Sequence, residues 1–124
     1  MKVRTILYVE DNELNRKIVR DMLRRTSYRL LEATDGETGI AIARTECPDL
    51  ILMDIQLPKI SGLEAMRVLR QAGETAHTPI IAITSFALSG DDQKAKDAGA
   101  SAYLAKPYSP RELLDMIREL VPEA

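Results

Sequence analysis

Apolar residues gather in short runs that are separated by longer polar or mixed segments. The runs at 50–53 and 80–83 are continuous, which is typical of strands that are buried on both faces of a sheet. Less uniform runs precede and follow them at similar spacing. We therefore predict five strands, which cover residues 6–9, 28–31, 50–53, 80–83 and 102–105.

The segments between these runs carry the signals of helices. Apolar residues three and four apart predict a first helix from the cap Asn12 to about residue 25. Ser or Thr followed three residues later by Glu predicts three further helix starts, at Thr34, Ser61 and Ser109. A helix from Ser89 that ends at Gly99 completes the set. The inward stripe predicted for the first helix is Leu14, Ile18 and Met22, with Val19 and Leu23 beside them.

Strands and helices therefore alternate along the whole chain. This alternation predicts an α/β fold with a parallel sheet, covered by helices on both faces and joined by right-handed crossovers. A length of 124 residues suits one folded unit, so we predict a single domain over residues 1–124 with no output domain.

The amino-acid composition argues against several classes of function for this chain. The net charge of -2 does not favour nucleic acid or an anionic membrane as a direct partner. One cysteine, Cys47, and the lack of an apolar run near the roughly 20 residues of a membrane span predict a soluble protein of the cytoplasm. Basic residues near the start are interleaved with acids, which indicates a solvated helix face. They are Arg16, Lys17, Arg20, Arg24 and Arg25.

Chemically active side chains follow four of the predicted strands. Because the carboxyl ends of parallel strands share one edge, these side chains are expected to meet there. They are Glu10 and Asp11 after the first strand, Asp54 after the third, Thr84 and Ser85 after the fourth, and Lys106 after the fifth.

Three carboxylates at one edge need a compensating cation. At a separation of about 5 Å each pair would repel by roughly 3 kcal/mol at an effective dielectric of 20. Carboxylate oxygens suit Mg²⁺, which leaves coordination positions for phosphate oxygens. Lys106 adds a positive charge and Thr84 a hydroxyl, so the set predicts phosphoryl transfer to Asp54 as nucleophile. Each residue alone also has an ordinary structural explanation, such as helix capping, and only the combination is specific.

Four motifs resemble the receiver domain of bacterial two-component response regulators. They are V-E-D-N at 9–12, L-M-D-I-Q-L-P-x-x-S-G at 52–62, I-T-S-F-A at 83–87 and Y-L-A-K-P at 103–107. The similarity extends over residues 4–120, and the single-domain DivK-type regulators share the most motifs. The resemblance implies a doubly wound, flavodoxin-like sheet of strand order 2-1-3-4-5 with five helices.

The resemblance also implies roles for individual residues. Asp54 would accept a phosphoryl group from a phosphohistidine of a sensor histidine kinase or a phosphotransfer protein. Mg²⁺ would be held by Glu10, Asp11, Asp54 and the main-chain carbonyl of Gln56. Lys106 would pair first with Asp54 and later with the phosphate, and the Lys106–Pro107 bond would be cis. Glu10 replaces the Asp that relatives often have.

Switching is implied as well. Thr84 would move toward the phosphoryl oxygens while Tyr103 turns inward, and the face made by the fourth helix, fifth strand and fifth helix would change shape for a downstream partner. We predict a phosphorylation-controlled binding protein in two-component signal transduction, one that is not a turnover enzyme. Two alternatives stay open: an aspartyl-phosphate phosphohydrolase, and an adaptor that acts independently of phosphorylation.

Overall fold

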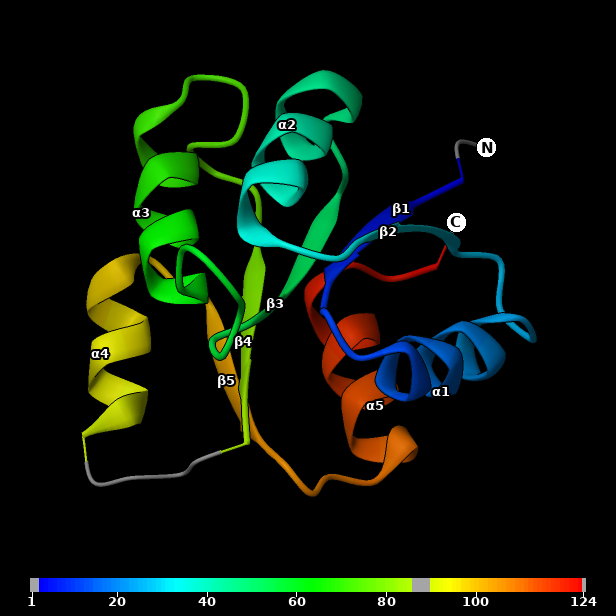
Figure 1. Ribbon diagram of the computed structural model, residues 1–124. Helices are drawn as coiled ribbons and strands as arrows, with labels where there is room; N and C mark the ends of the chain where they lie inside the picture. The colour runs from blue at the N-terminus through cyan, green and yellow to red at the C-terminus, as the bar shows by residue number, and fades with distance from the viewer. Residues whose placement is uncertain (1–2, 86–89, 124) are drawn as a thin grey trace.

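Strands and helices alternate in the computed structural model, which describes residues 3–85 and 90–123 (Figure 1). The strands are β1 (Thr5–Val9), β2 (Arg29–Ala33), β3 (Leu50–Asp54), β4 (Ile80–Thr84) and β5 (Ala102–Ala105). The helices are α1 (Glu13–Leu23), α2 (Gly36–Glu46), α3 (Gly62–Gln71), α4 (Asp91–Ala98) and α5 (Pro110–Leu120). The predicted order of elements is confirmed.

The strands form one parallel sheet in the order β2-β1-β3-β4-β5, which confirms the predicted topology. Strand β3 lies in the centre, and each of its residues is buried. Asp54 at its end is level with Ile83, one residue before Thr84, on the neighbouring strand. The carboxyl ends of β1, β3, β4 and β5 therefore lie along one edge of the sheet, which we call the carboxyl edge.

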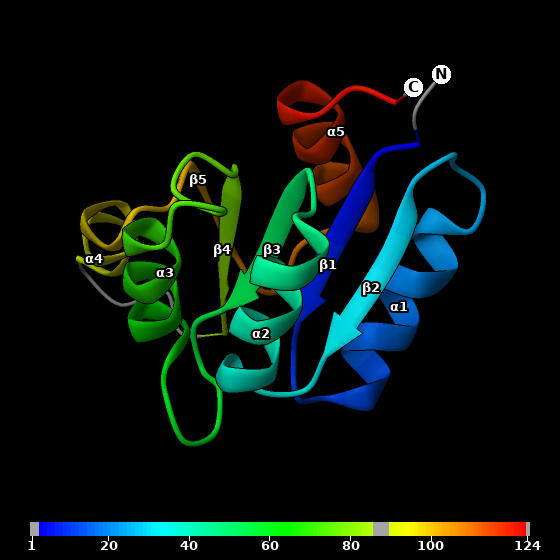
Figure 2. The ribbon, with the colours of Figure 1, turned by 90° about the horizontal axis from the view of Figure 1, so that it is seen from above.

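Helices cover the sheet on both faces (Figure 2). One core lies under α1 and α5 and includes Ile6 and Tyr8 from β1. The other lies under α2, α3 and α4 and includes Leu7 and Val9 from the same strand. Successive side chains of a strand point to opposite faces, so β1 contributes to both cores.

The predicted inward stripe of α1 is wrong at two positions. Val19 and Leu23 are buried as predicted, but Leu14 is 64% exposed and Ile18 is 43% exposed. The apolar residues of this helix span a wider arc than one packing face, because each residue turns the helix by about 100°. The arc that includes Val19 and Leu23 contacts the sheet, so Leu14 and Ile18 remain on the surface.

Helix starts follow the predicted signals with one correction. Ser61 and Ser109 cap α3 and α5, and Ser109 forms a reciprocal capping box with Glu112. Helix α2 is capped by Asp35 and not by Thr34, since the Asp35 side chain accepts a hydrogen bond from the backbone N–H of Thr38. The predicted start at Ser89 lies outside the described residues. Gly99 ends α4 in the left-handed conformation, as predicted.

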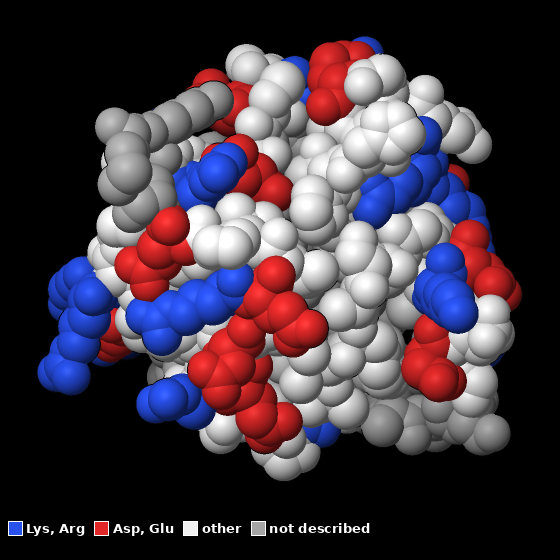
Figure 3. Space-filling model, turned by 180° about the vertical axis from the view of Figure 1, so that it is seen from behind, with Lys and Arg blue, Asp and Glu red and all other residues white. Residues whose placement is uncertain are grey.

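Charged side chains of both signs are interleaved on the surface. On the face shown in Figure 3, Lys and Arg lie beside Asp and Glu and form no large patch of one sign. On α1, Lys17 pairs with Asp21 and Arg20 pairs with Glu32, which supports the interpretation of this helix as a solvated face. Within the described residues, the helices are all too short or too polar to span a bilayer.

Candidate functional site

Acidic side chains from β1 and β3 meet at the carboxyl edge. Glu10 is 1% exposed and Asp54 is 2% exposed, whereas Asp11 is on the surface. One carboxylate oxygen from each of the three lies within 4.8 Å of the others. The structure thus brings together three of the residues that the sequence placed in a metal site.

The two buried carboxylates influence each other's ionisation. Burial raises the pKa of Asp54, and the neighbouring Glu10 carboxylate raises it further. Burial alone would also raise the pKa of Glu10, but the hydrogen bond with Asp54 and the pairing with Lys106 hold it below its usual value. In the absence of a cation the pair therefore resists carrying two full negative charges, and ionisation of Asp54 is the more strongly disfavoured.

Lys106 supplies the positive charge of the site. Its Nζ lies 2.8 Å from Glu10 Oε1 and 3.5 Å from Asp54 Oδ2. The family resemblance implied Asp54 as its first partner, but the closer carboxylate here is Glu10. The peptide bond between Lys106 and Pro107 is cis. One ammonium beside a cluster of three carboxylates leaves the site with excess negative charge.

Four hydrogen-bond donors outside the acidic cluster hold Glu10. Its Oε1 accepts from the Tyr8 hydroxyl at 3.2 Å, from Asn15 Nδ2 at 3.1 Å and from Lys106 at 2.8 Å. Its Oε2 accepts from the backbone N–H of Asn12 at 3.3 Å. Sequence reasoning missed Tyr8 and Asn15. Tyr8 could have been found, because residues two apart on a strand share a face.

Tyr8 is protonated at any physiological pH. Its side chain is fully buried, and this burial, reinforced by Tyr108 and Glu10, raises its pKa well above the usual value. The hydroxyl therefore keeps its proton, which it can donate to Glu10.

The Gln56 side chain links two loops at the site. Its Nε2 donates to Thr84 Oγ1 at 2.7 Å, and its Oε1 accepts from the backbone N–H of Ser85 at 2.9 Å. The Gln56 backbone N–H donates to Asp54 Oδ1 at 3.0 Å. The sequence predicted only a main-chain carbonyl role for Gln56, and this stays a prediction. The amide of its side chain was not foreseen as a partner of Thr84.

The loop after β3 is closely fitted to Asp54. A Cβ atom on Gly62 would lie 2.1 Å from the main-chain oxygen of Asp54. The Gly62 backbone N–H donates to the Ile55 carbonyl at 2.9 Å. Only glycine allows this approach, so the start of α3 fixes the backbone that presents Asp54.

These residues fit a hard divalent cation. The oxygen ligands of Glu10, Asp11 and Asp54 are close enough to share one ion, and their charges exceed the single compensating ammonium of Lys106. Mg²⁺ prefers oxygen ligands and commonly takes few of them from the protein. The donor set therefore suits Mg²⁺ better than a softer metal, which favours sulfur or imidazole ligands.

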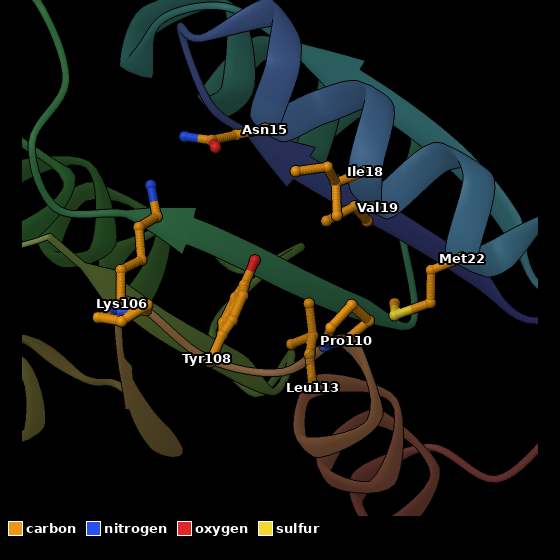
Figure 4. Close-up of a pocket in the computed structure, with 9 residues that line it drawn as sticks. Asn15, Ile18, Val19, Met22, Lys106, Tyr108, Pro110 and Leu113 are labelled. Carbon is orange, nitrogen blue, oxygen red and sulfur yellow. The ribbon is translucent and has the colours of Figure 1, made fainter.

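A groove of about 320 Å³ opens beside the site, between α1 and the segment that joins β5 to α5 (Figure 4). Asn15 and Ile18 extend into it from α1, opposite Lys106 and Tyr108. Lys106 belongs both to the groove and to the acidic site. A molecule bound in the groove would thus reach Lys106, whose Nζ lies 3.5 Å from Asp54 Oδ2.

Tyr103, the predicted switch residue, lies away from this groove. It is partly buried and packs against the core under α2, α3 and α4. It also borders a shallow depression that includes Asp92 and Lys96 of α4. The structure places Tyr103 next to α4, while its movement stays a prediction.

Known proteins are similar to this chain in sequence and in fold. Residues 6–118 match the response regulator receiver domain family. The polar-differentiation response regulator DivK of Brucella anthropi is 40% identical over 121 residues, and the match covers 98% of each chain. The DivK protein of Brucella ovis shows the same identity and coverage.

Solved structures of other proteins have a similar fold. The chemotaxis response regulator CheY4 of Vibrio cholerae has a TM-score of 0.90 and 28% identity, and the match covers 97% of this chain and 100% of that one. The receiver domain of a sensor histidine kinase from Pseudomonas aeruginosa has a TM-score of 0.88 and 37% identity, with 96% and 98% coverage. That structure contains a magnesium ion coordinated in the active site cleft. With its motifs, topology and acidic site, this chain belongs to the family of response regulator receiver domains, and it is DivK-like.

Proposed function

We propose that this protein accepts a phosphoryl group on Asp54 from a phosphohistidine of a histidine kinase or phosphotransfer protein, in a reaction that depends on Mg²⁺. The phosphorylated form would then bind a downstream partner differently. The observation that carries the proposal is the meeting of Glu10, Asp11 and Asp54 with Lys106 at one edge of the sheet. Family membership agrees with it.

The chemistry follows from the positions of the side chains. An Asp54 carboxylate oxygen attacks the phosphorus of the donor, and a P–O bond forms while the P–N bond to histidine breaks. The electron pair of that bond stays on the imidazole nitrogen. Glu10, Asp11 and Asp54 would hold Mg²⁺, which would neutralise their charge and that of the incoming group.

Lys106 and Thr84 act on the phosphoryl oxygens in this scheme. The Lys106 ammonium lies 3.5 Å from Asp54 and can pair with the new phosphate once it forms. The Thr84 hydroxyl is now bonded to the Gln56 amide, and its predicted move toward the phosphate would break that bond. Phosphorylation would then alter the end of β4, and with it the face formed by α4, β5 and α5.

The phosphodonor is proposed to dock over α1 and the groove beside Lys106. Leu14 and Ile18 are exposed on α1, Ile18 lines the groove, and Lys106 at the groove lies 3.5 Å from Asp54. Leu14→Glu should slow transfer from a phosphohistidine protein and leave labelling by a small phosphodonor unchanged. An equal loss with both donors would assign Leu14 to the chemistry and contradict docking.

The decisive experiment compares Asp54→Asn with Asp49→Asn. Asp49 is an acid at the opposite end of β3, where it accepts a hydrogen bond from the Thr5 backbone N–H. Incubation with a small acyl phosphate and Mg²⁺ should give an acid-stable, base- and hydroxylamine-sensitive acyl phosphate in the wild type and in Asp49→Asn. Asp54→Asn should give none. Undiminished labelling of Asp54→Asn would overturn the proposal.

The same assay separates the two alternatives. Steady release of phosphate from several phosphate esters, beyond one equivalent per site, would identify a phosphohydrolase. Partner binding that is equal with and without phosphodonor would identify an adaptor. Neither is favoured by a specific observation, and Gln56 stands where phosphohydrolases of the haloacid-dehalogenase type have a second Asp. The cytoplasm, predicted from the sequence, is the compartment in which such a kinase would meet this protein.

A further inference from the structure

We propose that Tyr8 is a positioning residue that sets the Mg²⁺ affinity of the site by fixing the Glu10 carboxylate. The Tyr8 hydroxyl donates to Oε1 of Glu10 from inside the core. This inference rests on the proposed function, because it assumes that Glu10 is a ligand of Mg²⁺. It concerns a residue that contacts neither the metal nor the phosphoryl group.

The two oxygens of Glu10 have different surroundings. Three donors converge on Oε1, namely the Tyr8 hydroxyl, Asn15 Nδ2 and Lys106 Nζ. Among the described donors outside the acidic cluster, Oε2 accepts only from the Asn12 backbone N–H. A carboxylate oxygen has about two lone-pair positions. Oε1 is therefore saturated, and Oε2 is the oxygen with capacity left for a cation.

Tyr8 is the most rigid of the three donors to Oε1. It is fully buried on β1, two residues before Glu10 and on the same face of the sheet. Asn15 comes from α1 and borders the open groove, and the Lys106 side chain is 17% exposed. A tyrosine ring enclosed in a packed core has little freedom to move. Its hydroxyl therefore holds the Glu10 carboxylate in a fixed position.

The role of Tyr8 becomes larger during the proposed reaction. Lys106 is expected to leave Glu10 for the phosphoryl group, which removes one of the donors to Oε1. Glu has one methylene more than Asp, so an untethered Glu10 has additional rotamers in which no oxygen faces the other two acids. Tyr8 and Asn15 are the donors that stay and keep Glu10 in a ligand position.

The test is the isosteric change Tyr8→Phe, which removes the hydroxyl and retains the ring. Loss of one hydrogen bond should weaken Mg²⁺ binding by about threefold to tenfold in titration calorimetry. Tyr28→Phe is the matched control, because Tyr28 is a second buried tyrosine whose hydroxyl donates to the Val121 carbonyl. It should leave Mg²⁺ affinity unchanged.

A double-mutant cycle separates positioning from a general loss of packing. The shorter Glu10→Asp side chain falls short of the Tyr8 hydroxyl, so Tyr8→Phe should have no effect on Mg²⁺ affinity in that background. Equal weakening in both backgrounds would overturn the inference, and so would unchanged affinity of Tyr8→Phe alone. If the wild-type protein bound no Mg²⁺ at millimolar concentrations, that result would contradict the proposed function itself. The inference about Tyr8, which depends on that function, would then also be wrong.

Discussion

Acidic side chains at the two ends of the sheet differ in the partners that balance their charge. At the amino ends of the strands, Asp49 accepts from the Thr5 backbone N–H at 2.8 Å, and the Tyr28 hydroxyl donates to the Val121 carbonyl. Near them Glu123 pairs with Arg118. Each acid there has its own donor or cation. At the carboxyl edge, Glu10 and Asp54 share the Lys106 ammonium, and a third acid, Asp11, lies beside them.

Hydrogen bonding is not what distinguishes the two ends. Within the described part of the chain, every buried side-chain nitrogen or oxygen has a hydrogen-bond partner. The difference is charge, because buried Glu10 and Asp54 face one ammonium while a third acid, Asp11, lies beside them. The amino end contributes to stability, whereas the like charges at the carboxyl edge cost stability, a cost that the proposed cation would offset.

The largest expected effect comes from Gly62→Ala, which would distort the carboxyl edge. The new Cβ would lie 2.1 Å from the Asp54 carbonyl oxygen, so the backbone that presents Asp54 must shift. We expect a loss of at least about 3 kcal/mol in the free energy of unfolding. Gly73→Ala is the control, since a Cβ there meets nothing within 4 Å. Similar urea midpoints for the two variants would contradict the close fit.

The next largest effect on the free energy of unfolding should come from removing a buried charge. This effect should be an increase in stability. Asp54→Asn removes a buried carboxylate whose pKa is raised, first by burial and then by Glu10. The unfolded chain ionises Asp above about pH 4, whereas the folded site resists ionisation. Wild-type stability therefore falls as the pH rises from about 4 to the raised pKa.

In the absence of Mg²⁺, Asp54→Asn should stabilise the protein by about 2 kcal/mol at pH 8 and by less at pH 5. Mg²⁺ should raise the melting temperature of the wild type and have a much smaller effect on the variant. Asp49→Asn, at the amino end, should not be stabilising at either pH. Thermal melts at both pH values measure all three effects. A pH-independent gain for Asp54→Asn would show that charge is not the cause.

How far the sequence predicts the fold depends on how uniformly each segment is buried. The central strands β3 and β4 are buried at every position, and their continuous apolar runs indicated them directly. Edge strand β2 is exposed or half-buried at most positions, and its predicted bounds were shifted toward Tyr28. For α1, the spacing indicated a helix but could not select which part of a wide apolar arc would face the sheet, so Leu14 and Ile18 were placed wrongly.

The sequence predicted those features of the site that follow from the strand order of the sheet. A parallel sheet brings strand ends together whatever the side-chain rotamers are, and this located Glu10, Asp54, Thr84 and Lys106. The pairings depend on rotamers and on distances of a few tenths of an ångström. The preference of Lys106 for Glu10 and the bond from Gln56 to Thr84 join residues far apart in the chain, so spacing could not reveal them.

The smallest expected change in unfolding free energy comes from a substitution at the amino end of the sheet. Tyr28→Phe removes a hydroxyl that donates to the Val121 carbonyl and leaves the ring in the core under α1 and α5. The unfolding free energy should fall by about 1 kcal/mol, the usual contribution of one hydrogen bond. Burial raises the pKa of Tyr28, so the hydroxyl is neutral and the loss should be the same at pH 5 and pH 8. It should also be the same with and without Mg²⁺ in urea titrations. A loss that changed with Mg²⁺ would mean that the two ends of the sheet are coupled, and the amino end could then no longer be regarded as purely structural.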